Sequence, residues 1–334
     1  MAFFLGVDIG TSAIKVILLD EEQIHHASAS VPLDIFRPSD GWSEQSPEAW
    51  WQGVDTAVCQ IARDHPEKIA ALRSIGLSGQ MHGLVALDEN NAVLRRAILW
   101  NDTRAGKEAA ALDRNEQDFR LIGGNMVMAG FTAPKAVWMA KYEPELFAQI
   151  RTILLPKDYI RFRLTGKKVS DMSDASGTLW LDVANRCWSK KLLALCGLDL
   201  EQMPELVEGS DISGFLRPEL CRKWGIRGDV TVAGGAGDNA AAAIGLGVRN
   251  PGDSLISLGT SGVVFSVTEH FSQRTEQAVH AFCHALPDSW HQMGVILSAT
   301  DSLNWLSEVT TLPFSELLAQ MKPEDSHKTL PVFH

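Results

Sequence analysis

Two short segments of the sequence have the residue types that bind phosphate. Residues 10–12 are Gly-Thr-Ser, stand between two apolar runs and closely follow Asp8, and the same three residue types recur at residues 259–261. A turn of this composition offers backbone N–H groups and hydroxyls to a phosphate, and a neighbouring carboxylate can hold Mg²⁺ through water. Alone, the first segment is explained more simply as the turn of a β-hairpin. The second copy makes phosphate binding the stronger hypothesis.

Another carboxylate stands where it could act as a base. Asp238 follows the glycine-rich residues 234–237 and begins an alanine-rich stretch that ends near Gly245. A carboxylate at a helix start is ionised, because the helix end favours negative charge, and it can accept a proton from a hydroxyl. Taken alone, Asp238 is explained more simply as a cap of this helix. One residue can do both, so Asp238 is the candidate base.

Histidines and tryptophans supply further candidates. His82 and Trp100 lie in polar clusters, at residues 78–83 and 100–104, that follow apolar strands. Open α/β sheets bind ligands at this edge, although a single histidine is more often structural. His280 and His284 have the i, i+4 spacing of helical metal ligands. The alternating apolar residues around them predict a strand instead, so we expect no metal there.

The periodicity of apolar residues predicts the elements that must position these groups. A β-meander is expected from strands at 3–7, 13–19 and 24–33, followed by a helix with Ser46 as its cap and Pro47 at its first position. Residues 105–228 are predicted to be mostly helical. The remaining predicted strands are 72–77, 84–87 paired with 93–99, 229–233, 254–258, 262–267 and 291–297. The remaining predicted helices are 133–142, 188–195, 238–245 and those beginning at Ser298 and Phe314.

Composition limits the function classes. The 334 residues are 45% hydrophobic and 21% charged, which is typical of a folded globular protein of roughly two domains. The net charge of −11 disfavours binding to nucleic acid or to an anionic membrane. No apolar run is long enough to span a membrane and no leader is evident, so we expect a cytoplasmic protein. The five scattered cysteines indicate neither disulfides nor a zinc site.

These motifs together resemble the FGGY family of carbohydrate kinases, which belongs to the actin, sugar kinase and Hsp70 fold superfamily. The similarity rests on segments that occur in family order along the chain, namely residues 7–12, 41–45, 79–83, 98–104, 155–159, 171–175, 237–241 and 258–262. The resemblance implies an α/β, ribonuclease H-like lobe at residues 1–249, in which helices flank a mixed β-sheet. It also implies the beginning of a second, similar lobe at residues 250–334.

The resemblance further implies ATP-dependent phosphorylation of D-xylulose to D-xylulose 5-phosphate, because residues 80–83 favour this sugar over glycerol or ribulose. Asp238 would be the general base, and Asp8 would hold Mg²⁺ through water. The residues assigned to the ATP phosphates are Gly10, Thr11, Ser12, Lys15, Gly259, Thr260, Ser261 and Gly262. Lys15 is as well explained as a solvated strand lysine. The residues assigned to the sugar are Met81, His82, Trp100, Arg104, Asp238 and Asn239.

Alternatives remain open at this level. Family members continue past position 334 through a glycine-rich adenosine-binding segment, so we expect the second lobe to be incomplete. The chain could be an FGGY kinase for another sugar or polyol, such as gluconate, or a non-catalytic sugar-binding module. The expected partners are ATP, Mg²⁺ and a small sugar, with a homodimer as a further expectation.

Overall fold

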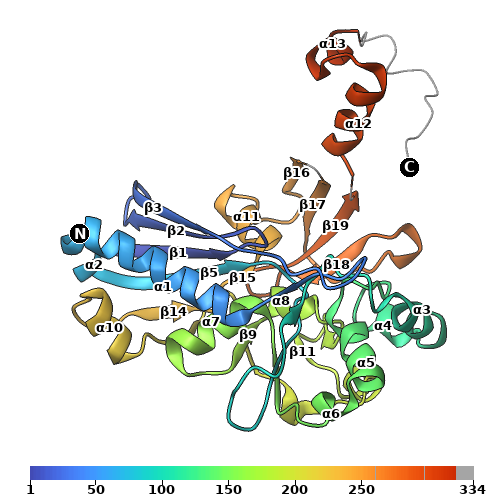
Figure 1. Cartoon of the computed structure of the whole chain (residues 1–334), viewed down its shortest axis with the longest axis horizontal. Helices are drawn as coiled ribbons and strands as arrows, with labels where there is room; N and C mark the ends of the chain where they lie inside the picture. Colours follow the sequence, from blue (N-terminus) through green and yellow to red (C-terminus); the bar gives the residue numbers. More distant parts are fainter. Residues whose placement is uncertain (260, 297, 321–334) are drawn as a thin grey trace.

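The computed structural model describes residues 1–259, 261–296 and 298–320 (Figure 1). Its larger sheet has the strand order β13-β14-β5-β1-β2-β3, and β15 pairs with β5 beyond the end of β14. The strands of this sheet are β1 (Phe3–Ile9), β2 (Ala13–Asp20), β3 (His25–Pro32), β5 (Leu72–Gly79), β13 (Ile212–Phe215), β14 (Thr231–Ala233) and β15 (Ala236–Gly237). The chain is therefore α/β, with a mixed sheet flanked by helices.

The N-terminal meander forms as its alternating pattern predicts. Every second residue of β1 is buried, and β1 and β2 pair antiparallel from Phe3 with Asp20 to Ile9 with Ile14. Helix α1 (Pro47–Asp64) packs its apolar stripe against β2 and β3, with Trp50 fully buried. Pro47 begins this helix as predicted. Ser46 stands at the N-cap position, but its side chain makes no capping hydrogen bond.

The middle of the chain, residues 84–224, forms short helices joined by two- and three-residue strands. The helices after α1 are α2 (Pro66–Ala70), α3 (Gly106–Asn115), α4 (Asp118–Leu121), α5 (Thr132–Tyr142), α6 (Pro144–Phe147), α7 (Pro156–Thr165), α8 (Met172–Ser176), α9 (Lys190–Ala194) and α10 (Pro218–Trp224). The short strands are β4 (Glu44–Gln45), β6 (Val85–Leu87), β7 (Ala97–Ile98), β8 (Thr152–Leu154), β9 (Val169–Asp171), β10 (Leu181–Asp182), β11 (Cys187–Trp188) and β12 (Glu205–Val207).

Two predictions for this region are confirmed only in part. Residues 84–87 and 93–99 meet antiparallel at two isolated bridges, Leu84 with Ile98 and Leu87 with Val93, but the continuous pairing of β6 is with β8 and that of β7 is with β4. The helix expected at residues 188–195 is shorter, since Trp188 belongs to β11 and its indole N–H donates to the carbonyl of Pro204 at 2.8 Å. Partners distant in the sequence decide both outcomes.

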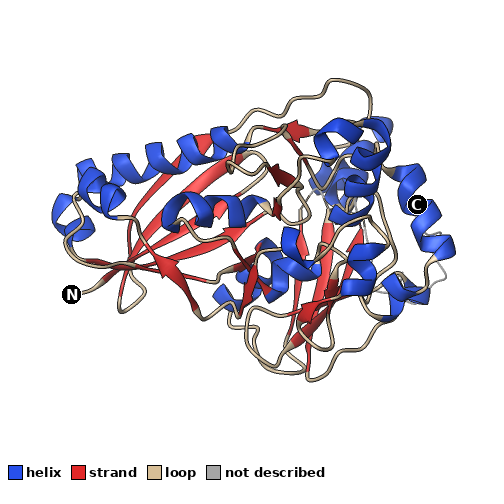
Figure 2. Cartoon of the chain, turned by 90° about the horizontal axis from the view of Figure 1, so that it is seen from below, coloured by secondary structure: helices blue, strands red, loops and turns tan. Residues whose placement is uncertain are grey.

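A second, antiparallel sheet follows helix α11 (Asp238–Gly245), in the order β16-β17-β19-β18. Its strands are β16 (Ser254–Leu258), β17 (Gly262–Thr268), β18 (His280–Cys283) and β19 (Trp290–Ile296). Figure 2 shows the strands gathered in two groups with helices around them. Phe265 and Phe282 of the second sheet share a hydrophobic core with Phe119 and Trp180 of the first part of the chain.

The last described helices are α12 (Thr300–Thr310) and α13 (Phe314–Ala319), which stand away from the two sheets (Figure 1). His280 lies in β18 and His284 directly follows it, so the strand predicted there is confirmed. Among the residues that the structure describes, no helix is long and apolar enough to cross a membrane.

Candidate active site

Three parallel strands of the larger sheet end side by side. The pairing aligns Asp8 of β1 with Ser78 of β5, and Ser78 with Ala236 of β15. One position later it aligns Ile9, Gly79 and Gly237. The chain therefore leaves the sheet at one level in all three strands, at Gly10, Gln80 and Asp238. This is the edge at which open α/β sheets bind ligands.

The first Gly-Thr-Ser turn closes tightly at this edge. The amide of Gly10 donates to the carbonyl of Ala13 at 3.1 Å, and a Cβ at Gly10 would stand 2.9 Å from that same oxygen. Ser12 is exposed at the tip of the turn. The glycine is therefore needed sterically, and the backbone of the turn faces the solvent side of the sheet edge.

Gln80, which the sequence analysis did not single out, fixes this turn to the end of β5. Its side-chain amide donates to the carbonyl of Gly10 at 3.4 Å and to Oε1 of Gln45 at 3.1 Å, and Gln45 donates to the carbonyl of Thr11 at 2.7 Å. Gln80 is 2% exposed. The two glutamines thus hold the turn from beneath.

The hydroxyl of Thr11 is already engaged. It donates to Oε1 of Gln80 at 3.1 Å and accepts from the indole N–H of Trp100 at 3.0 Å. Since a hydroxyl has a single proton to donate, this one is not available to a phosphate. A phosphate-binding role for Thr11 therefore depends on its backbone N–H.

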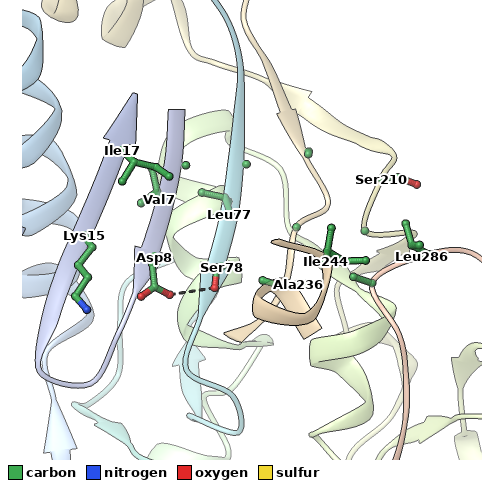
Figure 3. Close-up of a pocket in the computed structure, with 17 residues that line it drawn as sticks. Val7, Asp8, Lys15, Ile17, Leu77, Ser78, Ser210, Ala236, Ile244 and Leu286 are labelled. Carbon is green, nitrogen blue, oxygen red and sulfur yellow. Dashed lines mark hydrogen bonds between the residues drawn. The ribbon is translucent and has the colours of Figure 1, made fainter. Parts of the chain in front are cut away.

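Asp8 and Lys15 lie on neighbouring strands and line a cavity of about 530 Å³ (Figure 3). Oδ1 of Asp8 accepts a hydrogen bond from the hydroxyl of Ser78 at 3.0 Å. Ile17, Leu77, Ala236, Ile244 and Leu286 give the rest of the cavity an apolar lining. The half-buried carboxylate of Asp8 has the oxygen chemistry that Mg²⁺ prefers, and the exposed ammonium of Lys15 stands beside it.

Asp238 is the first residue of helix α11. Its Oδ1 accepts from the backbone N–H of Asn239 at 2.7 Å and from the Asn239 side chain at 2.9 Å, so Asp238 also satisfies the start of the helix. Although the residue is solvent-accessible, partial burial raises the pKa of its carboxyl to about 6, and the charge of Asp8 acts in the same direction. At pH 7 and above the carboxylate is still mostly ionised, and it is a stronger base than an ordinary aspartate.

Met81, which directly follows Gln80, packs beside the residue that precedes Asp238. It is 7% exposed, and a Cβ at Gly237 would stand 2.8 Å from its Cγ and Sδ. A Cβ at Gly177 would stand 2.9 Å from its Cε. The methionine therefore fills the space between two glycines, one of which directly precedes Asp238.

His82 is held in one orientation and one tautomer. Its Nδ1 lies 2.7 Å from the carbonyl of Gly177, an acceptor, so Nδ1 carries the proton and Nε2 is left with a lone pair. Burial lowers the pKa of His82 to about 3, which keeps the ring neutral. Phe131 contacts the ring edge-to-face at 4.6 Å. His82 thus offers an acceptor that suits a sugar hydroxyl.

Trp100 and Arg104 differ in their access to a ligand. Trp100 is 39% exposed and donates to Thr11, so it stands at the sheet edge. The side chain of Arg104 is 1% exposed and is bound to Asp102 at 2.7 Å and to Glu44 at 2.7 Å. Its guanidinium also lies 3.7 Å from the ring centroid of Trp42. This environment favours a positioning role for Arg104 over direct contact with a sugar.

The second Gly-Thr-Ser turn joins β16 to β17, as the first joins β1 to β2. The amide of Gly259 donates to the carbonyl of Ser261 at 2.9 Å, and Leu258 pairs with Gly262. The carbonyl of Gly259 also accepts from the hydroxyl of Thr300 at 2.6 Å. Thr260, predicted to bind phosphate, lies outside the described residues.

Comparison with protein families identifies the family that has this arrangement of motifs. Residues 3–245 match the N-terminal domain of the FGGY family of carbohydrate kinases. The chain belongs to this family. Xylulose kinase of Escherichia coli (strain K12) is 49% identical to it over 309 residues, 92% of this chain, and xylulose kinase of Bacillus subtilis (strain 168) is 40% identical over 91% of this chain. This FGGY chain spans about 63% and 61% of the lengths of these two relatives.

Solved structures show the same fold. A kinase from Brucella ovis described as a xyloylose kinase superposes with a TM-score of 0.93 at 52% identity, covering 94% of this FGGY chain and 65% of that chain. A glycerol kinase from Plasmodium falciparum with ADP superposes with a TM-score of 0.85 at 20% identity, covering 93% of this chain and 64% of that one. The actin and sugar-kinase fold predicted from the sequence is thus confirmed.

Proposed function

We propose that this chain belongs to an enzyme that transfers the γ-phosphoryl group of ATP to D-xylulose, giving D-xylulose 5-phosphate. The supporting observation is the alignment of β1, β5 and β15, which brings the Gly10 turn, Met81 with His82, and Asp238 to one sheet edge. Relatives named xylulose kinases, with 49% and 47% identity, favour this sugar among the family's substrates.

In this proposal Asp238 accepts the proton of the attacking sugar hydroxyl. A pKa of about 6 leaves the carboxylate ionised at neutral pH yet basic enough to take up the proton as the phosphoryl group arrives. Because phosphoryl transfer depends on positioning more than on covalent help, a modest base in contact with the hydroxyl suffices. Asn239, beside the base, would donate or accept at a neighbouring hydroxyl.

Sugar recognition is assigned to neutral acceptors and to shape. Nε2 of His82 accepts a hydrogen bond from a sugar hydroxyl, and Met81 provides an apolar wall. Trp100 lies at the entrance to the proposed sugar site. A buried acceptor that must be paired discriminates strongly against a ligand that lacks the matching hydroxyl. Arg104 holds the loop that carries Trp100.

The nucleotide side of the proposal uses both turns. Bound Mg²⁺ would neutralise charge on the transferring phosphoryl group, and Asp8 with its partner Ser78 would hold it through water. The backbone N–H groups of Thr11, Ser12, Thr260 and Ser261 would contact the phosphates, with Lys15 as an additional cation. Gly10, Gly259 and Gly262 would serve by shaping the two turns, since the amides of Gly10 and Gly259 close them. The cavity beside Asp8 is too apolar along most of its wall to be the phosphate site itself.

Two measurements test the proposal. Calorimetry on the 334-residue chain should show binding of D-xylulose, and ADP release by the complete enzyme across a panel of sugars should show D-xylulose as the preferred acceptor. Preference for gluconate or a polyol would replace the substrate while keeping the reaction class. Sugar binding with no measurable binding of MgATP would support a sugar-binding module instead, and no binding of any sugar would refute both.

A further inference from the structure

A cluster of charged side chains lies inside the protein between α7, β9 and α8. Nζ of Lys157 lies 2.8 Å from Oδ1 of Asp158, 2.5 Å from Oδ2 of Asp171 and 3.4 Å from Oδ2 of Asp174, and Nη1 of Arg161 lies 2.6 Å from Oδ1 of Asp158. All five side chains are fully buried. Taking such charges out of water is costly and does not by itself stabilise a fold. The cluster therefore calls for another explanation.

The cluster holds an ammonium group among three carboxyls that could otherwise hold a metal ion. The oxygens of Asp158, Asp171 and Asp174 lie within 4.8 Å of one another, but the ammonium of Lys157 already stands among them. Burial is the largest cause that raises the pKa of Asp174 well above its ordinary value, and the neighbouring carboxylates of Asp158 and Asp171 act in the same direction, whereas Lys157 opposes them.

Two side chains of this region hydrogen-bond to residues 234–237, the segment that directly precedes Asp238. The hydroxyl of Ser173 donates to Oδ1 of Asp171 at 2.6 Å and accepts from the backbone N–H of Gly237 at 3.1 Å. Nη2 of Arg161 donates to the carbonyl of Gly234. Residues 234–237 are thus held at both ends by side chains anchored in the buried cluster.

The segment 234–237 needs such support because its backbone interrupts a strand. Gly235 has φ +72°, and a Cβ there would stand 2.2 Å from the carbonyl oxygen of Leu77. Only the two residues of β15 resume pairing with β5 before the chain turns into α11. The amides of Gly234 and Gly235 also donate to the carbonyls of Asp211 and Gly209, at 2.8 and 2.9 Å. At the end of the segment, directly before Asp238, the amide of Gly237 is held by Ser173.

We propose that Ser173, supported by Asp171 and Lys157, is a positioning residue that sets the place of Asp238 at the sheet edge. This inference rests on the proposed role of Asp238 as the base. Ser173 itself touches neither sugar nor nucleotide; it acts by fixing the amide of Gly237. The rigid cluster behind it explains why charged groups are kept in the interior.

Ser176 supplies a matched control on the same helix. It is also fully buried, and its hydroxyl donates to the carbonyl of Met172 at 2.8 Å and accepts from the backbone N–H of Cys283 at 3.0 Å. Like Ser173 it donates one hydrogen bond and accepts one from a backbone N–H, but it links α8 to β18 and not to the segment before Asp238. Removing either hydroxyl should lower stability, more so at Ser173 because its bond to a carboxylate is the stronger one.

The test compares Ser173→Ala with Ser176→Ala in the 334-residue chain. The carboxyl carbon resonance of Asp238, assigned as the signal lost in Asp238→Asn, should shift or broaden in Ser173→Ala and stay unchanged in Ser176→Ala. D-Xylulose affinity, measured by calorimetry, should fall about tenfold in Ser173→Ala, as expected when one hydrogen bond to the sugar is lost. It should stay within twofold in Ser176→Ala. Ser173→Cys, which keeps the volume but hydrogen-bonds weakly, should give the same changes without a cavity.

The outcomes separate this inference from the proposed function. An unchanged Asp238 resonance in both Ser173 variants, or equal changes in Ser173→Ala and Ser176→Ala, would overturn the positioning role. If the unsubstituted chain does not bind D-xylulose, the proposed function fails, while the resonance still decides whether Ser173 positions Asp238.

Discussion

At the scale of single residues, hydrogen bonds to neighbouring groups decide what each candidate side chain can offer a ligand. The carbonyl of Gly177 accepts a hydrogen bond from Nδ1 of His82, and Oε1 of Gln80 accepts one from the hydroxyl of Thr11. The first arrangement leaves an acceptor free, whereas the second uses up a donor. Residue type alone therefore does not fix these roles.

The two nitrogens of His82 have separable functions, which a pair of substitutions tests. His82→Asn keeps a donor near the position of Nδ1 but removes the acceptor at Nε2, and asparagine tolerates the backbone φ of +69° found here. D-Xylulose affinity should fall about tenfold, the equivalent of one hydrogen bond, and stability should also fall because the ring contact with Phe131 is lost. His82→Gln keeps an acceptor near Nε2 and loses the bond to Gly177, so its larger effect should be on stability. Calorimetry of both variants measures the loss of sugar affinity, and urea unfolding measures the loss of stability. Equal losses of affinity in the two variants would contradict the role of Nε2 as the sugar acceptor.

Asp238→Asn tests the base. Asparagine keeps the shape and can still accept a hydrogen bond from the sugar, but it cannot take up a proton. Sugar affinity should therefore stay within a few fold. Turnover, measured as sugar-dependent ADP release by the complete enzyme, should be abolished. Near-normal turnover would remove Asp238 from the role.

At the scale of elements, close approach between backbone segments explains why glycines stand where they do. The strand pairing brings Gly237 to the same level as Gly79, and Met81 occupies the space where a Cβ at position 237 would lie. Gly245, at the other end of α11, has open space around it. Helix α11 is thus preceded by a glycine that packing requires and ends at a glycine that packing does not require.

Gly237→Ala should displace Met81 and with it the wall of the sugar site. We expect D-xylulose affinity to fall at least tenfold and stability to fall by about 1–3 kcal/mol, the usual cost of overpacking. Gly245→Ala is the control, because a helical alanine there is expected to raise stability by about 0.5–1 kcal/mol and leave the sugar site intact. Urea unfolding and calorimetry check both variants. Equal sugar affinity in the two would show that Met81 is not part of the site.

Elements with a strong local pattern were predictable from the sequence, and elements defined by distant partners were not. The alternation in β1 and β2 and the apolar stripe of α1 are local signals, and both predictions are confirmed. β6 and β7 are too short to show a period, and their partners β8 and β4 lie far along the chain. The roles of Gln80 and Ser173 were missed for the same reason, since the hydrogen bonds that join Gln80 to Thr11 and Ser173 to Gly237 span 69 and 64 positions of the chain.

At the scale of the whole molecule, the shared core shapes how the two predicted lobes relate. Phe265, Phe282 and Met293 of the second sheet pack in one cluster with Leu84 and Trp180. His82 and His280 both contact Phe131, which lies between the two parts of the chain. The sugar-site histidine is therefore part of the packing that joins the second sheet to the first part of the chain. A substitution of this histidine should therefore also weaken the packing between the two parts of the chain.

This packing also gives the stability a defined dependence on pH. Burial lowers the pKa values of His82, His280, His284 and His291 below the ordinary 6.5. As the pH falls through about 6.5, the unfolded chain takes up protons that the folded chain does not. Stability that is fully present above this pH is then lost, at up to about 1.4 kcal/mol per pH unit for each ring. Asp238 opposes the trend, because its raised pKa lets the folded chain bind one more proton below about pH 6.

Urea unfolding between pH 7.5 and pH 5 should therefore show stability falling with acidification, and two variants should change the slope in opposite directions. His82→Asn removes one ring that resists protonation, so its slope should be shallower. Asp238→Asn removes the opposing carboxyl, so its slope should be steeper below pH 6. Carboxyls with lowered pKa values, such as Asp20 and Asp113, lose their contribution nearer pH 4 and do not enter this window. Identical slopes in the three proteins would contradict the linkage, whereas slopes that diverge in these directions would tie the candidate base and the sugar-site histidine to the stability of the joined core.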